Sequence, residues 1–218
     1  MIQKDLQSIT EFIYRDDIFS LHICPLTETH AEIIHAAVML SRENFLPFMC
    51  WVHGELSVEG QLKRICQAQE QWAKGKEYNF SVFDQNTREF LMSATLRQAK
   101  APNKNAFEIG YWTVLQHCNK GLATLVTRIL TVMAVDLLKS DRVEIFCNSS
   151  NKKSRRVAEK CGFILEGDMR NYFSEPTVEM IKNGFHPDRT GSGYSLISQD
   201  LKTLPWVDEV RGKLSLSL

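Results

Sequence analysis

A short polar turn, residues 115–124, carries the residue types best suited to binding chemistry in this sequence. It separates a strand-like segment from a helix-like one. The first turn of a helix leaves backbone N–H groups unpaired, and the helix dipole adds roughly half a positive charge there. Gly121 permits close approach of the main chain, and Lys120 adds a full positive charge beside it. The turn therefore suits a phosphate or pyrophosphate ligand, with a purely structural turn as the alternative.

Two other phosphate-binding turns are excluded by their missing glycines. The chain contains no Gly-x-x-x-x-Gly-Lys-Ser/Thr sequence, so a P-loop is not indicated. It contains no Gly-x-Gly-x-x-Gly sequence either, so the pattern gives no support to a dinucleotide-binding fold.

The elements around the turn predict a mixed α+β fold. Residues 108–114 are β-rich and aromatic, whereas residues 125–138 have apolar side chains at helical spacing. Segments 78–83 and 90–98 also read as strands, and short turns join them to the next strand. Three successive strands joined in this way indicate an antiparallel meander.

Further helices and strands follow from caps and alternation. Thr29 and Glu32 resemble a capping box that opens a helix to about residue 41. Ser150 or Asn151 is expected to cap another helix, which ends near Gly162. The remaining expected elements are a helix over 57–74, strands over 18–26, 142–147, 163–166 and 194–201, a loop over 101–105, and an irregular loop with a short helix over 168–193. We expect a single domain over residues 1–218, with its core at about 18–201, a lead-in that could hold a short helix, and a C-terminal tail.

Composition narrows the classes of function. Lys plus Arg and Asp plus Glu are equal at 26 each, which argues against a general nucleic-acid binder. The six cysteines are scattered without a Cys-x-x-Cys pair, so neither a metal site nor a redox site is expected. Scattered cysteines favour a reducing, cytoplasmic compartment, and neither a signal peptide nor a membrane span is visible.

Residues 44–51 form a dense aromatic segment around Pro47. Phe45, Phe48 and Trp51 supply more apolar surface than an exposed loop requires. The segment is therefore either part of the core or one wall of a cleft.

Four motifs in this order resemble the GNAT superfamily of N-acetyltransferases, and more narrowly its RimJ/RimL group, which acetylates N-terminal α-amines of ribosomal proteins and related substrates. The motifs are residues 44–51, residues 108–112 (Glu-Ile-Gly-Tyr-Trp), residues 119–124 (Asn-Lys-Gly-Leu-Ala-Thr), and Asn151-x-x-Ser154 followed by residues 161–167. The resemblance covers roughly residues 18–201.

The resemblance implies a central mixed, mostly antiparallel sheet that is splayed in its middle, flanked by helices, and holds acetyl-coenzyme A in the split. The pantetheine arm would pair with the strand at 109–114, and the pyrophosphate would sit on the turn at 118–124. The implied cofactor-binding residues are Trp112, Thr113, Val114, Cys118, Asn119, Lys120, Gly121, Leu122, Ala123, Thr124, Asn151 and Ser154. Cys118 stands where the family has Gln, Arg or an aromatic residue, and Asn119 stands where glycine is common. Asn tolerates positive φ, so the turn can survive the second change.

Acetyl transfer needs a neutral amine and a proton for the departing thiolate. An α-amine has a pKa of about 7.7–8.0, whereas that of lysine is about 10.4, so an α-amine needs only a modest base. Glu108 is the candidate base, or else a solvated strand-end carboxylate. Ser154 is the candidate acid, or else a capping residue, and Tyr172 is an alternative acid or a packing residue.

Other residues receive weaker roles. Asn151 would hold the pantetheine amide or simply cap the helix, and Phe45, Phe48, Trp51 and Tyr172 would contact the substrate. His117 is left out as a base, and Cys118 is left out as a nucleophile because no helper His–Asp arrangement is apparent in the local sequence.

Three functions follow from these residues. The first is acetylation of a protein or peptide α-amine. The alternatives are acetylation of a small amine (a polyamine, amino sugar or antibiotic) and a catalytically silent coenzyme-A-binding module. Either a monomer or a homodimer is compatible with the sequence.

Overall fold

The computed structural model describes Leu6, residues 10–99 and residues 105–217, so most of the loop expected at 101–105 lies outside the described residues. Its centre is a nine-stranded sheet with the strand order β7-β8-β6-β5-β4-β3-β2-β1-β9. The strands are β1 (Glu11–Arg15), β2 (Ser20–Pro25), β3 (Glu77–Asp84), β4 (Phe90–Gln98), β5 (Ala106–Thr113), β6 (Arg142–Asn148), β7 (Ile164–Met169), β8 (Gly191–Ile197) and β9 (Leu214–Ser217).

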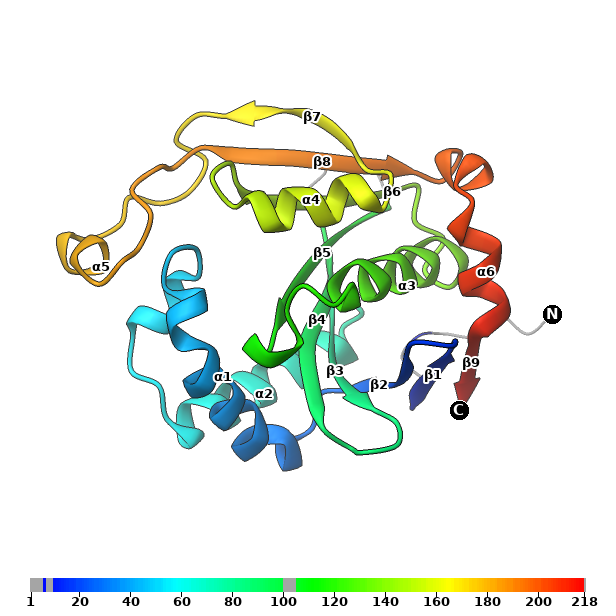
Figure 1. Ribbon diagram of the computed structural model, residues 1–218, viewed down its shortest axis with the longest axis horizontal. Coiled ribbons are helices and arrows are strands. Elements are labelled where there is room, and N and C mark those ends of the chain that lie inside the picture. Colours follow the sequence, from blue (N-terminus) through cyan, green and yellow to red (C-terminus); the bar gives the residue numbers. More distant parts are fainter. Residues whose placement is uncertain (1–5, 7–9, 100–104, 218) are drawn as a thin grey trace.

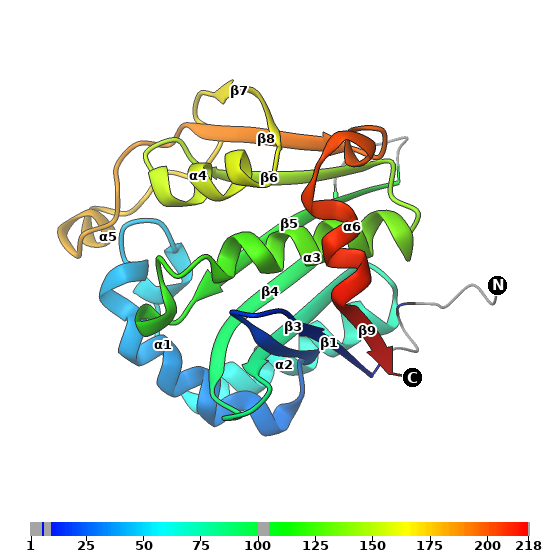
Figure 2. The same ribbon diagram turned by 45° about the vertical axis from the view of Figure 1, so that its right-hand side comes forward.

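Helices lie on both faces of this sheet (Figures 1 and 2). The helices are α1 (Ala31–Phe45), α2 (Val58–Ala73), α3 (Leu122–Asp136), α4 (Lys152–Lys160), α5 (Val178–Lys182) and α6 (Trp206–Lys213). Helices α3, α4 and α6 cover one face, which we call the inner face, and α1 and α2 pack on the other, the outer face. We therefore expect a ligand held in the sheet to meet α3 or α4 on the inner face and α1 or α2 on the outer face.

Local sequence explains where the main helices begin. The Ser57 side chain accepts a hydrogen bond from Gly60 N and caps α2, and Asn151 accepts one from Ser154 N and caps α4. Asn151 rather than Ser150 is therefore the cap. Helix α3 is buried along most of its length because β4, β5 and β6 pack under it and α4 and α6 pack beside it. The amphipathic pattern thus predicted α2 correctly, and the apolar pattern predicted α3 correctly.

Both ends of the chain differ from expectation. The N-terminal lead-in contains β1 in addition to 3₁₀ helical geometry at Leu6, and the expected tail forms α6 and β9. Strand β9 pairs antiparallel with β1, so the two ends complete one edge of the sheet. Four-residue and five-residue strands carry little periodic signal, and their pairing is decided by contacts distant in sequence.

Two other expectations were wrong in detail. The capping box ahead of α1 is formed by Thr27 and His30, not by Thr29 and Glu32, because a 3₁₀ turn over Glu28–His30 precedes the helix. Helix α1 also runs beyond residue 41 to Phe45. The loop expected over 168–193 is shorter, since β7 extends to Met169 and β8 begins at Gly191.

The sheet opens between β5 and β6, which confirms the splayed mixed sheet that the family resemblance predicted. These strands form the parallel pair of the sheet, and their register stops after Glu108 opposite Glu144. Strand β5 stays paired with β4 as far as Thr113, and β6 stays paired with β8 as far as Asn148. Each strand therefore has one paired edge and one edge facing the split.

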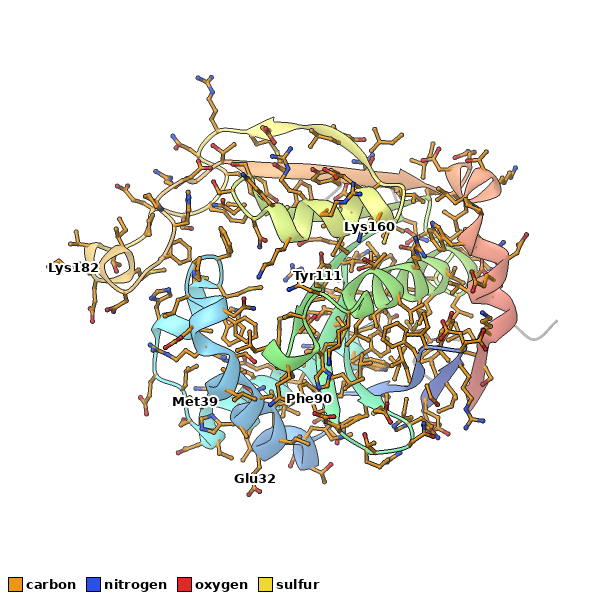
Figure 3. The ribbon with its side chains drawn as sticks, viewed as in Figure 1. Glu32, Met39, Phe90, Tyr111, Lys160 and Lys182 are labelled. Carbon is orange, nitrogen blue, oxygen red and sulfur yellow. The ribbon has the colours of Figure 1, made fainter. Side chains whose placement is uncertain are left out.

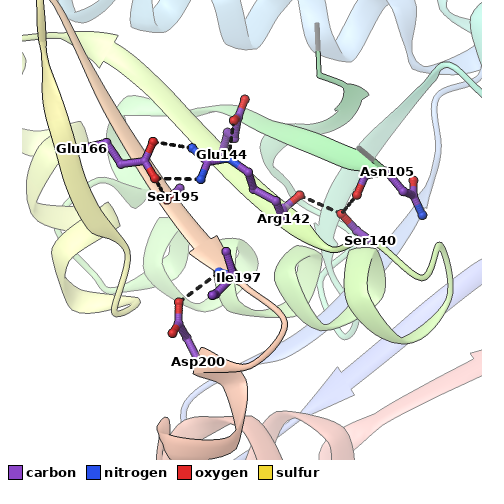
Figure 4. A network of polar contacts seen from close by, with 8 residues as sticks. All are labelled: Asn105, Ser140, Arg142, Glu144, Glu166, Ser195, Ile197 and Asp200. Carbon is purple, nitrogen blue, oxygen red and sulfur yellow. Dashed lines mark hydrogen bonds and ion pairs between the residues drawn. The ribbon is translucent and has the colours of Figure 1, made fainter. Parts of the chain in front are cut away.

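A polar network fixes the closed end of the split (Figure 4). The Arg142 guanidinium donates to both carboxylate oxygens of Glu166 at 2.7 and 2.6 Å, and to Glu144 at 2.6 Å. Ser195 also donates to Glu166 at 2.6 Å. Bidentate arginine pairs fix geometry as well as charge, so β6, β7 and β8 are held together where β6 meets β5.

Candidate active site

A cavity of about 840 Å³ occupies the split and the turn that follows β5. This volume lies in the range of roughly 300–1,000 Å³ typical of small-molecule sites. Its lining comes from the end of α1, from β5, from the turn and the start of α3, and from α4. The site is thus built where the sheet leaves strand edges unpaired.

The turn presents a helix N-terminus to this cavity. Asn119 and Gly121 both have positive φ, 62° and 86°. Asparagine tolerates such a φ, so it can replace the glycine that is common in the family at position 119. Gly121 is the N-cap of the 15-residue helix α3, and no side chain caps that helix end. A Cβ atom built at Gly121 would meet no heavy atom within 4 Å. The first N–H groups of α3 are therefore open to an anion.

Positive side chains line the opposite wall. Lys152, Lys153, Arg156 and Lys160 all come from α4 and border the cavity. Figure 3 shows Lys160 at the end of α4, with Tyr111 on β5 below that helix. A helix terminus facing four cations fits a ligand that carries several phosphate charges.

The strand edges suit a ligand with amide groups. Residues 109–113 of β5 have no strand partner on the β6 side among the described residues. Their backbone groups can pair with an inserted extended chain as a strand edge does. Asn151 lines the same cavity, and its side-chain oxygen is already occupied by Ser154 N at 3.1 Å.

Three polar side chains meet across the split. Tyr111 Oη lies 3.1 Å from Ser154 Oγ, which joins β5 to α4. Burial raises the pKa of Tyr111, so its hydroxyl stays protonated at neutral pH. Burial also raises the pKa of Cys147 on β6, while a hydrogen bond with Ser154 acts in the opposite direction. Ser154 therefore stands between proton donors from both strands of the split.

Sequence reasoning missed Tyr111 and Cys147 as neighbours of Ser154. A tyrosine on the core-facing side of a strand needs a partner for its hydroxyl, and that signal was present in residues 108–112. The identity of the partner was not, because Ser154 is 43 residues away in the chain.

Most of the expected site residues line the cavity. Those that do are Phe45, Phe48, Trp112, Thr113, Cys118, Asn119, Gly121, Leu122, Ala123, Thr124, Asn151 and Ser154. Five lie outside it: Glu108, Val114, Lys120, Trp51 and Tyr172. The Val114 side chain is buried in a core cluster with residues of α1, and its N–H donates to Leu91 O. Its C=O accepts from His117 N, so the main chain of Val114 borders the turn.

Glu108 lies at the closed end of the split. Its carboxylate accepts a hydrogen bond from Arg97 at 2.9 Å, and Glu144 is its partner across the last paired rung. Tyr172 stacks on Phe146 with ring centroids 5.2 Å apart. Burial raises the pKa of Tyr172, and the charges of Glu108 and Glu144 raise it further. Glu108, Glu144 and Tyr172 therefore lie near one another on the outer face beside the split. The catalytic roles of Glu108 and Tyr172 stay predictions.

The aromatic segment forms a partition. Phe45, Trp51 and Trp112 pack with ring centroids 5.4 to 6.3 Å apart. Phe45 lines the cavity described above, Trp51 lines a second cavity, and Trp112 lines both. The segment is thus neither simply core nor simply one cleft wall.

The arm around α5 closes over this segment, which the sequence did not predict. His186 N donates to Pro47 O at 2.9 Å, and the His186 ring stacks on Phe48 at 6.0 Å. Phe185 packs edge-on against His53 at 5.4 Å. The open end of the split is therefore bridged by contacts between residues more than 130 apart in the chain.

His117 and Cys118 have local partners. His117 Nε2 lies 2.9 Å from a carboxylate oxygen of Glu89, which ties the turn to the residue just before β4. Burial raises the pKa of Cys118, so its thiol is less ionised than that of a free cysteine. Neither residue has the arrangement of an activated nucleophile.

Within the described residues, no group of His, Cys, Asp and Glu side chains is arranged to hold a metal ion. In the same part of the chain, every helix is too short or too polar to cross a membrane. The site therefore offers an anion pocket, free strand edges and a proton-donor cluster.

Comparison with known proteins gives this geometry a family. A model of the acetyltransferase (GNAT) domain matches residues 20–164. The probable N-acetyltransferase YjcK of Bacillus subtilis (strain 168) is 33% identical over 153 residues, which are 69% of this chain and 84% of that protein.

Two solved structures share the fold. Mycobacterium smegmatis RimJ in complex with CoA-disulfide superposes with a TM-score of 0.79 at 14% identity, covering 98% of this chain and 100% of that one. The ribosomal L7/L12 α-N-protein acetyltransferase RimL, in complex with coenzyme A, superposes with a TM-score of 0.73 at 22% identity. That match covers 86% of this chain and 98% of that one.

Proposed function

This chain belongs to the GNAT acetyltransferase family, and we propose that it transfers the acetyl group of acetyl-coenzyme A to an N-terminal α-amine of a protein or peptide. The observation that carries the proposal is the split between β5 and β6, which ends at the uncapped N-terminus of α3. Similarity to RimL, whose acceptor is a ribosomal protein α-amine, supports the choice of acceptor.

The residues present fit coenzyme A chemically. Its phosphates suit the N–H groups of residues 122–124 and the cations of α4, and its pantetheine amides suit the free edge of β5. When bound, acetyl-coenzyme A supplies an acyl thioester.

The proposal assigns one proton donor, Ser154, and one proton acceptor, Glu108. Ser154, held against Tyr111, donates toward the sulfur of the departing thiolate. Glu108 receives the proton of the amine, directly or through water, at the closed end of the split. Aromatic walls from Phe45 and Trp112 exclude water from the thioester.

We further propose that residues 1–218 act as one domain, as a monomer or a homodimer, in the cytoplasm and without a nucleic-acid partner. The balanced charge and six free cysteines support this part of the proposal.

The test is thiol release from acetyl-coenzyme A, measured with peptides that have free α-amines, with blocked peptides and with small amines. We expect turnover with peptides that have free α-amines. Mass spectrometry should then find an acetyl group on the N-terminal nitrogen. Turnover limited to polyamines, amino sugars or antibiotics would replace this acceptor, and no turnover despite coenzyme A binding would indicate a silent binding module.

A further inference from the structure

A second cavity, of about 770 Å³, lies on the outer face of the sheet and is not explained by the binding of acetyl-coenzyme A. Its floor comes from β3, β4 and β5, and α1 and α2 form its walls. We call it the outer groove, and define it by Trp51, Arg64, Gln71, Glu77, Asn79 and Ser93 with their neighbours in the lining.

The outer groove and the split are neighbours across β5. Trp112 lines both cavities, and Gly110 is on the same face of the strand as Trp112. A Cβ built at Gly110 would meet no heavy atom within 4 Å, and Gly110 does not need a positive φ. Glycine inside a strand weakens it and often marks a place where another chain approaches closely. Gly110 therefore leaves open space on the outer face of β5, two residues from the Trp112 side chain that borders both cavities.

The floor of the outer groove is polar although it lies under helices. Asn79, Thr95 and Gly110 are register partners across three strands. Thr95 donates to the Asn79 side chain at 2.7 Å, and Asn79 donates to Glu77 at 2.9 Å. The side chains of Gln71 and Ser93 have no hydrogen-bond partner in the part of the chain that the structure describes. Free carboxamide and hydroxyl groups match the N–H and C=O groups of a peptide backbone.

We propose that the outer groove binds the peptide chain that follows the acceptor amine, with polar or basic rather than acidic residues preferred. This deepens the proposed function and rests on it for the identity of the amine. Neighbouring strands lie about 4.8 Å apart, so Asn79 is about 10 Å from Gly110. An extended peptide spans about 3.3 Å per residue, so the first three or four residues reach Asn79.

The charged side chains in the lining of the outer groove favour a basic peptide over an acidic one. The lining holds two carboxylates, Glu70 and Glu77, and one cation, Arg64. Arg64 lies over the Trp51 ring at 5.5 Å, which leaves its charge partly satisfied by the indole. Glu70 also lies 3.9 Å from Lys74, in an exposed pair that solvent screens. An acidic peptide would therefore meet repulsion from the two carboxylates, and a basic one attraction.

Binding of bisubstrate conjugates tests the groove without turnover. The probes are coenzyme A joined through an acetyl spacer to the α-nitrogen of alaninamide, of Ala-Ser-Lys-Ser-amide, or of Ala-Ser-Glu-Ser-amide. We expect the lysine tetrapeptide conjugate to bind at least tenfold more tightly than the alaninamide conjugate, and the glutamate conjugate to bind less tightly than the lysine one.

Variants locate that gain. Asn79→Leu in β3 and Gln71→Leu in α2 should each reduce the affinity gain of the lysine tetrapeptide conjugate at least threefold. Neither should change Kd for coenzyme A. Glu70→Lys should reverse the preference between the two tetrapeptides. Asn86→Leu, in the exposed β3–β4 turn, is the matched control and should change nothing.

Two results would overturn the proposal: equal affinity of the alaninamide and tetrapeptide conjugates, or an equal gain from a conjugate carrying a linear diamine. Peptide turnover is a separate measurement. Failure of turnover with intact conjugate selectivity would contradict the proposed function, whereas turnover without selectivity would contradict the groove alone.

Discussion

Tyr111 Oη lies 3.1 Å from Ser154 Oγ, although β5 and α4 are separated by a helix and a strand in the chain. Because β5 and β6 diverge after Glu108, this hydrogen bond is one of the contacts that span the split near its floor. It places a hydroxyl relay beside the expected position of the thioester.

Removing the Ser154 hydroxyl tests this relay. Ser154→Ala keeps the helix cap, since Asn151 binds the backbone N–H of residue 154. We expect kcat to fall by about 100-fold, at the lower end of the range for proton-transfer catalysis, with Kd for coenzyme A unchanged. Tyr111→Phe should give a smaller loss in kcat. An unchanged kcat in Ser154→Ala would assign the residue to capping alone.

Glu108→Gln tests the base. The substitution keeps the shape and removes the proton acceptor, so kcat/KM should fall by about 100-fold in steady-state assays. Glu144→Gln is the matched control, since Glu144 is the register partner of Glu108 and is held by Arg142. If both variants lose activity equally, the effect belongs to charge at the closed end of the split rather than to a base.

Gly121→Val tests the anion site. A β-branched residue is strained at φ 86°, and its side chain would enter the space open to the ligand. We expect Kd for coenzyme A to rise at least tenfold in calorimetry. Gly184→Val carries similar strain at φ 92° with equally open surroundings, but lies in the α5 arm, so its affinity for coenzyme A should be normal. Normal affinity in Gly121→Val would place the phosphates elsewhere.

The pH dependence of the rate identifies the acceptor amine. A neutral amine is required, so log kcat/KM for a peptide should rise with pH below about 7.7 and level off above about 8. A lysine acceptor would keep the rate rising to about pH 10. The check is a pH profile with a free peptide, a blocked peptide and a peptide whose only amine is lysine. Activity on the blocked lysine peptide equal to that on the free one would contradict the α-amine assignment.

Cys118→Ala tests direct transfer. Because burial raises the pKa of Cys118, the reactive thiolate is scarcer at pH 7 than for a free cysteine. We expect kcat within about twofold of the parent protein and slow alkylation of Cys118, whereas the exposed Cys50 and Cys66 should react first in peptide mapping. Loss of activity together with an acetyl group on Cys118 would show a covalent route.

Much of the architecture follows from local sequence. The Ser57 and Asn151 caps, the apolar spacing of α3 and the strand–turn–helix around Gly121 depend on side chains within a few residues of each other. The sequence therefore predicted the strand–turn–helix around Gly121, the meander that leads to it and, through family resemblance, the splayed sheet.

Tertiary structure alone decided which distant groups share the site. Ser154 meets Tyr111 and Phe48 meets His186 through packing of the helices and loops around the split, which no local pattern encodes. Likewise, β1 and β9 complete the sheet although short strands have weak periodic signals, and Gly110 acquires significance only because the structure leaves space at its missing side chain. Local propensities fix elements, but the positions of cavities and facing side chains depend on how those elements pack.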